Sequence, residues 1–282
     1  MDNQSKGKLF VVGTPIGNLG DMTSRAIKTL SEVDFIAAED NRVTAKLLHH
    51  FDIAKPMISY FEHNIRERGE EILGRILDGE SCAIVTDAGM PCISDPGEDL
   101  VRICAQQGVE IVVVPGASAA VSALAISGID TSRFSFEGFL STAKKNRADH
   151  LKEASGITRT LIFYEAPHKL IATLNDMLTA FGNRKISLCR EITKLHEEVI
   201  RTTLSGACEY YSQNVPRGEY VLIIEGAPKL SANEQDAVSL EQAVELAKEL
   251  IGAGARPADA CKIIAKQTGH KKSELYNAAV RD

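Results

Sequence analysis

The amino-acid sequence predicts an α/β protein with two α/β domains followed by a small helical domain. Short β-branched runs alternate with amphipathic segments from Leu9 onward, the rhythm changes near residues 128–131, and only helical patterns follow residue 238. Alternating strands and helices favour a mostly parallel sheet that is covered on both faces. We therefore expect an N-terminal α/β domain over residues 1–125, a second α/β domain over residues 126–228, and a linker with a helical tail over residues 229–282.

Hydrophobic periodicity places the individual elements along the chain. Strands are expected at residues 9–12, 35–38, 57–60, 83–85, 110–114, 134–140, 160–164, 185–189, 199–203 and 219–225. Helices are expected at residues 24–33, 43–51, 66–77, 98–107, 121–127, 170–178, 240–251, 257–267 and 273–280. Residues 229–238 form a polar linker, and residues 252–254, Gly-Ala-Gly, separate two of the tail helices.

Length, charge and cysteine usage bound the class of protein. A chain of 282 residues can form one large or two medium domains. The net charge of −6 argues against a general nucleic-acid coat but is compatible with a local basic patch. Six dispersed cysteines without a CxxC pair indicate buried free thiols rather than a metal site. No leader segment precedes the first strand and no apolar run reaches membrane-spanning length, so we expect a cytoplasmic protein without membrane contact.

Residues 83–97, AIVTDAGMPCISDPG, form the stretch around which the chain is organised. An apolar strand leads into a loop of small residues, and Asp95, Pro96 and Glu98 have the pattern of a helix start, with Asp95 as the N-cap. Open α/β sheets bind ligands where strand ends meet helix starts. Gly89 has no Cβ, so the backbone there can lie against a flat ligand. A structural strand–helix turn explains this stretch, taken alone, equally well.

Four other segments have both a structural and a functional interpretation. Residues 39–42, Glu-Asp-Asn-Arg, form either a solvated turn or a substrate-facing edge. Residues 115–120, PGASAA, suit a close ligand or tight helix–sheet packing. Residues 190–198, REITKLHEE, offer a phosphate grip and a proton acceptor, or a solvated charged turn. The tail, with its basic end, suits a helix-turn-helix module or a helical cap.

Seven segments in collinear order resemble one known family over about residues 8–228. The segments are VVGTPIGNLGD, AAEDNR, TDAGMPCISDPG, VVPGASAAVSAL, FEGFL, TLIFYEAPHKL and REITKLHEE. Together they are similar to the tetrapyrrole-methylase-like (class III) S-adenosylmethionine methyltransferases, in particular the branch that modifies small-subunit ribosomal RNA. Asn41 and Val43 depart from the family pattern, which commonly has Thr and His at these positions.

This resemblance implies a fold, a cofactor and a reaction. The fold has two α/β domains with S-adenosyl-L-methionine in the cleft between them, and the protein forms a homodimer. The reaction is methylation of the ribose 2′-oxygen of a cytidine in the decoding region of small-subunit ribosomal RNA. The partner is therefore ribosomal RNA or the small ribosomal subunit.

The reaction chemistry and the matching motifs select candidate site residues in three groups. A ribose hydroxyl is a poor nucleophile until a base takes its proton, so the site needs a cofactor cradle, an RNA platform and a proton acceptor. The cofactor-binding candidates are Asp87, Ala88, Gly89, Met90, Ile93, Ser118, Ala119, Tyr164 and Glu165. The catalytic candidates are Glu191, Lys194 and His196. The RNA-binding candidates are Asn18, Glu39, Asp40, Arg42, His63, Asn64 and Arg190, and Lys144 and Lys145 could extend the basic rim.

Two alternative functions remain open at this point. One is a methylase of a tetrapyrrole precursor or other small molecule, because the cofactor fold is shared. The charged segment 190–198 and the basic tail favour the RNA substrate, since a small macrocycle needs neither. The other is a non-catalytic RNA-binding or assembly factor, against which the small-residue loops argue because a binding protein needs no cofactor cradle.

Overall fold

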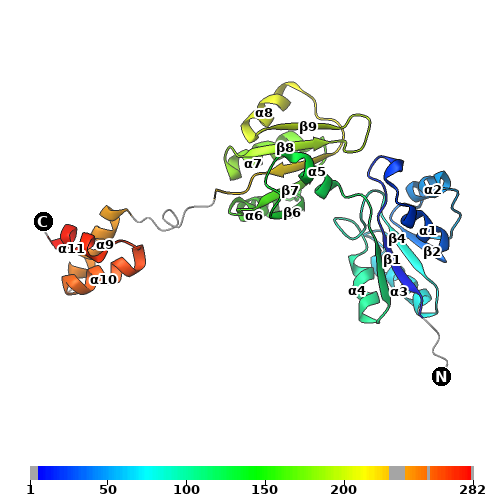
Figure 1. Ribbon diagram of the computed structural model, residues 1–282, viewed down its shortest axis with the longest axis horizontal. Coiled ribbons are helices and arrows are strands. Elements are labelled where there is room, and N and C mark those ends of the chain that lie inside the picture. Colours follow the sequence, from blue (N-terminus) through cyan, green and yellow to red (C-terminus); the bar gives the residue numbers. More distant parts are fainter. Residues whose placement is uncertain (1–5, 229–238, 253–254, 281–282) are drawn as a thin grey trace. The chain divides into compact units, whose positions relative to one another are not determined.

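The computed structural model describes residues 6–228, 239–252 and 255–280. The chain divides into two compact units, Met1–Ala227 and Pro228–Asp282, of which the first contains two sheets (Figure 1). The linker expected at residues 229–238 and the helix break expected at Ala253 and Gly254 lie outside the described residues.

The first lobe of the larger unit is a five-stranded, fully parallel sheet with the strand order β3-β2-β4-β1-β5. Its strands are β1 (Lys8–Val12), β2 (Phe35–Ala38), β3 (Met57–Ser59), β4 (Cys82–Val85) and β5 (Glu110–Val114). Its helices are α1 (Ser24–Glu32), α2 (Asn41–His50), α3 (Ile65–Leu77) and α4 (Glu98–Gln106), with a 3-10 turn η1 at Leu19–Asp21. The predicted parallel sheet is therefore confirmed for this lobe.

Both faces of the first sheet are buried, as the continuous apolar strands require. Leu9 and Val11 of β1 face a cluster with Ile72 of α3 and Leu100 of α4. The neighbouring Val12 faces the opposite cluster, which is formed by α1, α2 and the other strand faces. Because side chains alternate along a strand, each strand contributes to both clusters and fixes the helices on the two sides.

The second lobe is a mixed sheet with the strand order β6-β7-β10-β8-β9, in which β6 and β7 are parallel and the other pairs antiparallel. Its strands are β6 (Phe134–Phe139), β7 (Thr160–Glu165), β8 (Lys185–Arg190), β9 (Glu198–Thr203) and β10 (Tyr220–Ile224). Its helices are α5 (Ala119–Ser127), α6 (Lys144–Ser155), α7 (Leu170–Phe181) and α8 (Leu204–Gln213). The hydrophobic periodicity of the sequence did not predict the helices α6 and α8.

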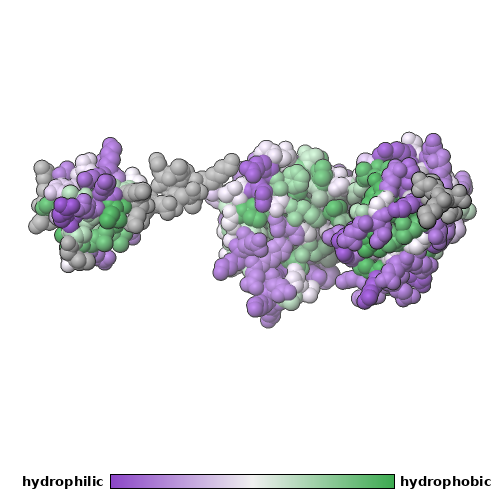
Figure 2. Space-filling model, turned by 90° about the horizontal axis from the view of Figure 1, so that it is seen from below, coloured by the Kyte–Doolittle hydropathy of each residue, from purple (hydrophilic) through white to green (hydrophobic). Residues whose placement is uncertain are grey.

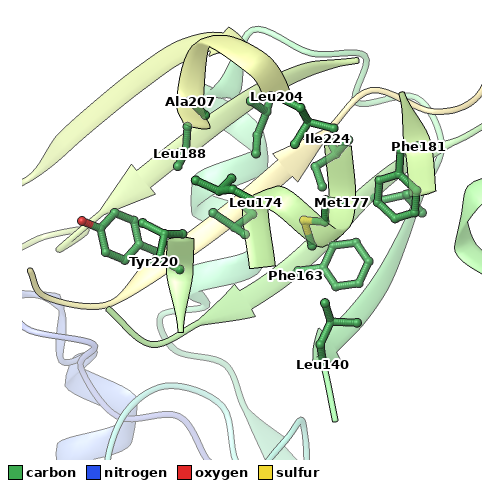
Figure 3. Packing of buried hydrophobic residues seen from close by; sticks show 14 of the residues in the cluster. Leu140, Phe163, Leu174, Met177, Phe181, Leu188, Leu204, Ala207, Tyr220 and Ile224 are labelled. Carbon is green, nitrogen blue, oxygen red and sulfur yellow. The ribbon is translucent and has the colours of Figure 1, made fainter. Parts of the chain in front are cut away.

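The two faces of the second sheet are covered differently. One face packs against α6, α7 and α8 through a large apolar cluster that includes Phe163, Leu174 and Tyr220 (Figure 3). The other face packs against α5 through Ala123, Ile162 and Val221. Helix α5 thus packs on the second sheet, and the boundary expected at residue 125 stays a prediction.

The described part of the smaller unit has three helices, α9 (Leu240–Gly252), α10 (Pro257–Thr268) and α11 (Lys272–Val280), close to the predicted bounds. Its core contains Ala243, Ala247, Cys261, Ile264 and Leu275. Figure 2 shows apolar residues between polar ones on the visible face of this unit, as expected for short amphipathic helices.

The predicted start of α4 at residue 98 agrees with the structure, but the predicted N-cap, Asp95, is wrong. The helix begins at Glu98, and Gly97, with φ of 134°, occupies the N-cap position instead of Asp95. A Cβ on Gly97 would lie 2.6 Å from Cys92 Sγ and 2.8 Å from Ile84 Cδ1, so the loop closes tightly on the strand. Cys92 and Ser94 also have positive φ values, 70° and 65°. These left-handed turns, which local sequence patterns do not indicate, keep residues 92–97 out of the helix and leave Asp95 free of a capping role.

The sequence predicts buried free thiols, and it predicts neither a metal site nor a membrane-spanning segment. All six cysteines are free, and Cys82, Cys104, Cys189 and Cys261 are buried, which confirms the thiol prediction for these four. Cys92 and Cys208 are half-buried. Among the described residues, no group of three or more His, Cys, Asp or Glu side chains could hold a metal ion. No helix in the described ranges is both long and apolar enough to cross a bilayer.

The core of the second lobe gives a direct stability test. Leu174 on α7 is fully buried, so Leu174→Ala removes packed atoms and leaves a cavity. We expect a loss of about 2–5 kcal/mol in the free energy of unfolding, measured by urea denaturation. The matched control Ile171→Ala lies on the same helix, where Ile171 is 45% exposed, and should change the value by less than about 1 kcal/mol. Equal losses in both variants would contradict the packing described here.

Candidate functional site

The strands of the first lobe bring several loops together at one edge. Strands β1, β4 and β5 are adjacent and parallel, so the loops after Val12, Val85 and Val114 leave the sheet side by side. Carboxyl ends of parallel strands are where open α/β sheets bind ligands. This edge therefore carries residues 13–18, 86–97 and 115–118, together with residues 39 and 40 after β2.

Backbone contacts lock these loops against one another. Thr14 and Gly89 exchange two hydrogen bonds, with N···O distances of 2.9 and 3.2 Å. A Cβ on Gly13 would lie only 2.7 Å from Gly116 Cα, so neither position accommodates a side chain. The Thr14 hydroxyl, which is buried, donates to the Thr86 carbonyl at 3.1 Å. The loops thus form a rigid floor whose small residues leave space above it.

A cavity of about 590 Å³ opens over this floor, between the first lobe and the second. Its size lies in the range typical of small-ligand sites. Its wall is mostly apolar, with a few acidic and hydroxyl groups. The lining includes Ile16, Ala88, Gly89, Met90, Ile93, Ser94, Asp95, Ser118, Ala119, Ala120, Val121, Phe134, Phe136, Phe139, Tyr164, Glu165, Ala166, Cys189, Glu191, Ile192, Lys194, Glu219, Tyr220 and Val221.

Tyr164 and the start of α5 form one side of this first cavity. The Tyr164 hydroxyl accepts a hydrogen bond from the Ala120 amide at 3.2 Å. The rings of Phe136 and Phe139 contact Tyr164 edge-on, with centroids 5.0 and 5.5 Å away. Burial raises the pKa of Tyr164, so its hydroxyl stays protonated. Tyr164 therefore serves as a rigid, neutral wall that fixes the helix start.

Lys194 and two carboxylates form the opposite side. Lys194 Nζ donates to Glu191 Oε1 at 3.0 Å and to Glu219 Oε2 at 2.9 Å. Burial alone would lower the pKa of Lys194, but the hydrogen bonds with Glu219 and Glu191 raise it above its ordinary value. Lys194 is accordingly protonated at neutral pH, and its ammonium group is a hydrogen-bond donor.

The segment that carries Lys194 is held in a strained conformation. Glu191 and Thr193 have positive φ values, 51° and 67°, which are uncommon for residues with a Cβ. Glu191 Oε1 accepts the Glu219 amide at 3.0 Å, and a Cβ on Gly218 would lie 2.5 Å from Glu191 Cγ. The Thr193 amide donates to Glu197 at 2.6 Å. These contacts fix the turn, so the Lys194 side chain has a defined position.

The Lys194 side chain also crosses to the first lobe. A Cβ on Gly17 would lie 2.4 Å from Lys194 Cγ, so the absence of a side chain at Gly17 allows the lysine stem to rest on that loop. A second cavity, of about 400 Å³, lies against this contact. Ile16, Ala88, Lys194 and Glu219 line both cavities. The second cavity also has Thr14, Pro15, Gly17, Leu19, Val43, Thr44, Lys46, Leu47, Thr86 and Asp87 in its wall.

Acidic groups gather where the two cavities meet the sheet edge. Glu39 accepts hydrogen bonds from the Thr86 hydroxyl at 2.5 Å and from the Asp87 amide at 3.4 Å. Burial, together with the negative charge of Glu39, raises the pKa of Asp87. Burial, Glu39 and Asp87 raise the pKa of Asp95 to about 6. The Asp95 carboxyl, which the sequence analysis treated only as a helix cap, thus becomes a titratable group in the first cavity.

The structure places eight of the nine cofactor-binding candidates in the wall of the first cavity. The exception is Asp87, which lines the second cavity. Glu165 has a structural role, because its two carboxylate oxygens accept hydrogen bonds from the Ala166 amide and the Thr173 hydroxyl. The eight residues come from the loop after β4, the start of α5 and the end of β7, which are far apart in the sequence.

The catalytic candidates separate into two groups. Lys194 lines both cavities, and Glu191 lines the first. His196 is exposed and is not among the residues that line either cavity. Glu219, which lines both cavities, was not selected from the sequence, because no local pattern indicates that the end of β10 returns beside Lys194.

Several of the RNA-binding candidates have structural roles. Asn18 caps the turn η1, and Asn64 bonds to the Phe61 amide and the Ser59 carbonyl. Asp40 caps α2 and pairs with Arg42, whose hydrogen bonds lower the pKa of Asp40 to about 2. Arg190 pairs with Glu198 at 3.0 Å, Glu39 binds Thr86, and His63 is exposed. Asn18 and Arg42 adjoin residues of the second cavity in sequence.

Comparison with known proteins identifies the family. A family model described as Tetrapyrrole (Corrin/Porphyrin) Methylases matches residues 8–208. A protein of Halalkalibacterium halodurans named "Ribosomal RNA small subunit methyltransferase I" is 46% identical over 273 residues, which is 96% of this chain and 94% of that protein. Proteins with the same name from Haemophilus influenzae (42%, covering 96% and 95%) and Thermotoga maritima (48%, covering 78% and 99%) are also similar.

Solved structures share the fold at low sequence identity. Cobalt precorrin-4 methyltransferase, a cobalamin biosynthetic enzyme, matches 77% of this chain and 94% of its own with a TM-score of 0.57 and 16% identity. A diphthine synthase matches 78% and 90% with a TM-score of 0.60 and 12% identity. The uroporphyrin-III C-methyltransferase of Thermus thermophilus complexed with S-adenosylhomocysteine matches 78% and 97% with a TM-score of 0.55 and 17% identity. The chain therefore belongs to the tetrapyrrole methylase family, in the branch whose curated members are named ribosomal RNA small subunit methyltransferase I.

Proposed function

We propose that the protein transfers a methyl group from S-adenosyl-L-methionine to the ribose 2′-oxygen of a cytidine in the decoding region of small-subunit ribosomal RNA. S-adenosyl-L-methionine is the methyl donor of its methylase family. The observation that carries the RNA substrate is near-full-length similarity, at 42–46% identity, to relatives named as methyltransferases of this RNA. A cytoplasmic location and a homodimer stay predictions.

The first cavity has the shape and surface that the cofactor needs. Gly89 has φ of 90°, and a Cβ there would lie 3.3 Å from Ile16 Cγ2, so the floor requires a residue without a side chain. The small side chains of Ala88 and Ala119 leave space in the neighbouring part of the cavity. The apolar side chains of Met90 and Ile93 can flank an adenine ring. We assign these residues, with Ser118 and Tyr164, to cofactor binding.

The start of α5 supplies a place for the carboxylate of the cofactor. Ser118 is the N-cap, and within the described chain its side chain makes no capping hydrogen bond. The first amides of a helix carry partial positive charge and favour an anion. Asp95 supplies negative charge in the same cavity, which suits the ammonium and sulfonium groups. The two ends of the cofactor's amino-acid part thus find complementary charges.

Lys194 stands where the reaction must occur. The ribose oxygen attacks the methyl carbon in line with the breaking carbon–sulfur bond and loses its proton. We propose that Lys194 Nζ donates a hydrogen bond to this oxygen and stabilises the negative charge that develops there. Glu191 orients Lys194, and Glu219, whose side chain is 81% exposed, accepts the proton and passes it to water. His196 stays a catalytic candidate on the basis of the sequence alone.

The proposed reaction is tested by methyl transfer to a defined RNA. Purified small subunits that lack native methylation are incubated with radiolabelled S-adenosyl-L-methionine, and the modified nucleoside is identified by mass spectrometry. We expect a 2′-O-methylated cytidine. Cofactor binding without incorporation into subunits or free ribosomal RNA would refute the RNA substrate.

Replacing Lys194 tests the role of its ammonium group. Lys194→Met keeps the stem over Gly17 but removes the donor, so kcat should fall by about 10²–10³-fold while S-adenosylhomocysteine affinity stays within a few-fold. The matched control is Lys185→Met, since Lys185 pairs with Glu225 at 3.5 Å on the same sheet and lines neither cavity. His196→Ala measured alongside tests the remaining catalytic candidate. Unchanged kcat in Lys194→Met would exclude the proposed role.

Because the Asp95 carboxyl titrates in the first cavity, we expect the affinity for the cofactor to depend on pH. This carboxyl is ionised above about pH 6 and neutral below, so attraction for a cationic cofactor weakens as the pH falls through 6. Between pH 7 and pH 5 the affinity for S-adenosyl-L-methionine, measured by calorimetry, should fall by up to about 10-fold. S-adenosylhomocysteine, which lacks the sulfonium charge, should respond less, and Asp95→Asn should flatten the profile. A pH profile that Asp95→Asn leaves unaltered would assign the effect to another group.

A further inference from the structure

Of the cofactor-binding residues assigned above, Ala88 alone also lines the second cavity, whose volume is about 400 Å³. It adjoins the first cavity, and Ile16, Ala88, Lys194 and Glu219 belong to both walls. A methyl transfer needs its acceptor on the far side of the methyl carbon from sulfur. A compartment that meets the cofactor compartment at the proposed donor group therefore has the right connectivity for an acceptor site.

Helix α2 provides an apolar wall for this cavity. Val43 and Leu47 lie one turn apart on the same face of α2, and Leu19 of the turn η1 also contributes. Leu19 is 43% and Val43 38% exposed, so apolar surface is presented to the opening of the cavity. A planar base packs well on such side chains, whereas its sugar and phosphates need the polar groups elsewhere in the wall.

Polar side chains also lie in the same wall. Thr44, a residue that is only 2% exposed, lines the cavity. Asp87 accepts the Asp40 amide through Oδ1 at 3.2 Å, and Oδ2 has no hydrogen bond within the described ranges. A carboxylate oxygen is thus available to a ligand that offers donors.

We propose that the second cavity binds the target nucleoside of the RNA, with the base against α2 and the ribose at the Lys194 boundary. This inference rests on the proposed function and specifies where its acceptor binds. Enzymes that modify a nucleotide within a folded nucleic acid take it out of the stack into a pocket. Cytosine offers an exocyclic amine, for which a carboxylate such as that of Asp87 is a suitable acceptor. Lys46, in the same wall, supplies positive charge for a flanking phosphate.

A filling substitution on α2 tests this assignment. Val43→Trp places a bulky ring in the second cavity without altering a residue of the first. We expect kcat/KM for small-subunit methylation to fall by about 100-fold or more, because displaced reactants lose this much rate. S-adenosylhomocysteine affinity and the melting temperature should match those of the unmodified protein. The matched control is Ala45→Trp, since Ala45 is exposed on α2 and does not line the cavity.

Thr44 provides a second, gentler variant. Thr44→Val preserves shape and removes the hydroxyl, and it should lower kcat/KM by about 5–10-fold, as expected for one lost hydrogen bond to substrate. Thr44→Ser keeps the hydroxyl and should restore most of the activity. This rescue separates a contact with the nucleoside from a packing effect on α2.

The outcomes distinguish the two proposals. If the unmodified protein incorporates no methyl groups into ribosomal RNA, the proposed function and this inference both fail. If the unmodified protein does methylate ribosomal RNA, two results would show that the nucleoside assignment is wrong while the proposed function stands. One is a kcat/KM of Val43→Trp equal to that of the unmodified protein. The other is an equal loss of kcat/KM in Val43→Trp and in the control Ala45→Trp. Loss of S-adenosylhomocysteine affinity in Val43→Trp would also overturn the assignment, because the second cavity would then belong to the cofactor.

Discussion

The contact of Lys194 with both lobes is the interaction on which the site depends. Two carboxylates hold its ammonium group, and the bare backbone of Gly17 supports its stem. A lysine in water keeps many rotamers, and ordering it has an entropic cost. Here the two ion pairs offset that cost, and the hydrogen bond between Glu191 and the Glu219 amide holds the turn that carries the lysine. The result is a fixed cation between two compartments, with its charge secured against burial by its partners.

Because the first lobe is rigid, the Lys194 side chain packs against a surface of defined position. The exchanged hydrogen bonds of Thr14 and Gly89 and the close approach of Gly13 to Gly116 tie three loops together at one sheet edge. The second lobe has a different role. Its sheet is thickly packed on the face shown in Figure 3, and the opposite face carries α5 and the wall of the first cavity. The well-packed face of the second sheet therefore supports the opposite face, which contributes to the wall of the first cavity.

Much of the fold follows from local sequence. Apolar runs such as residues 35–38 and 111–114 predict strands, and their spacing with amphipathic helices favours a parallel first sheet. The misplaced N-cap of α4 has a clear cause, because Asp-Pro before an amphipathic segment is a good helix start unless tertiary contacts prevent it. The close packing of Gly97 on Cys92 and Ile84 does so. Helix α6 escaped prediction because few of its residues are apolar and its buried face is narrow.

The sequence by itself determined the strands, the small-residue turns at their ends and the resemblance that points to a methylase. Those features depend on residues close together in the chain, which is why most of the first cavity's wall was predictable. Only the tertiary structure decided that Asp87 lines the second cavity, that Asp95 is a half-buried acid with a raised pKa, and that Glu219 contacts Lys194. Each of these depends on the burial and charge of groups from distant segments, and no local pattern encodes which distant groups become neighbours.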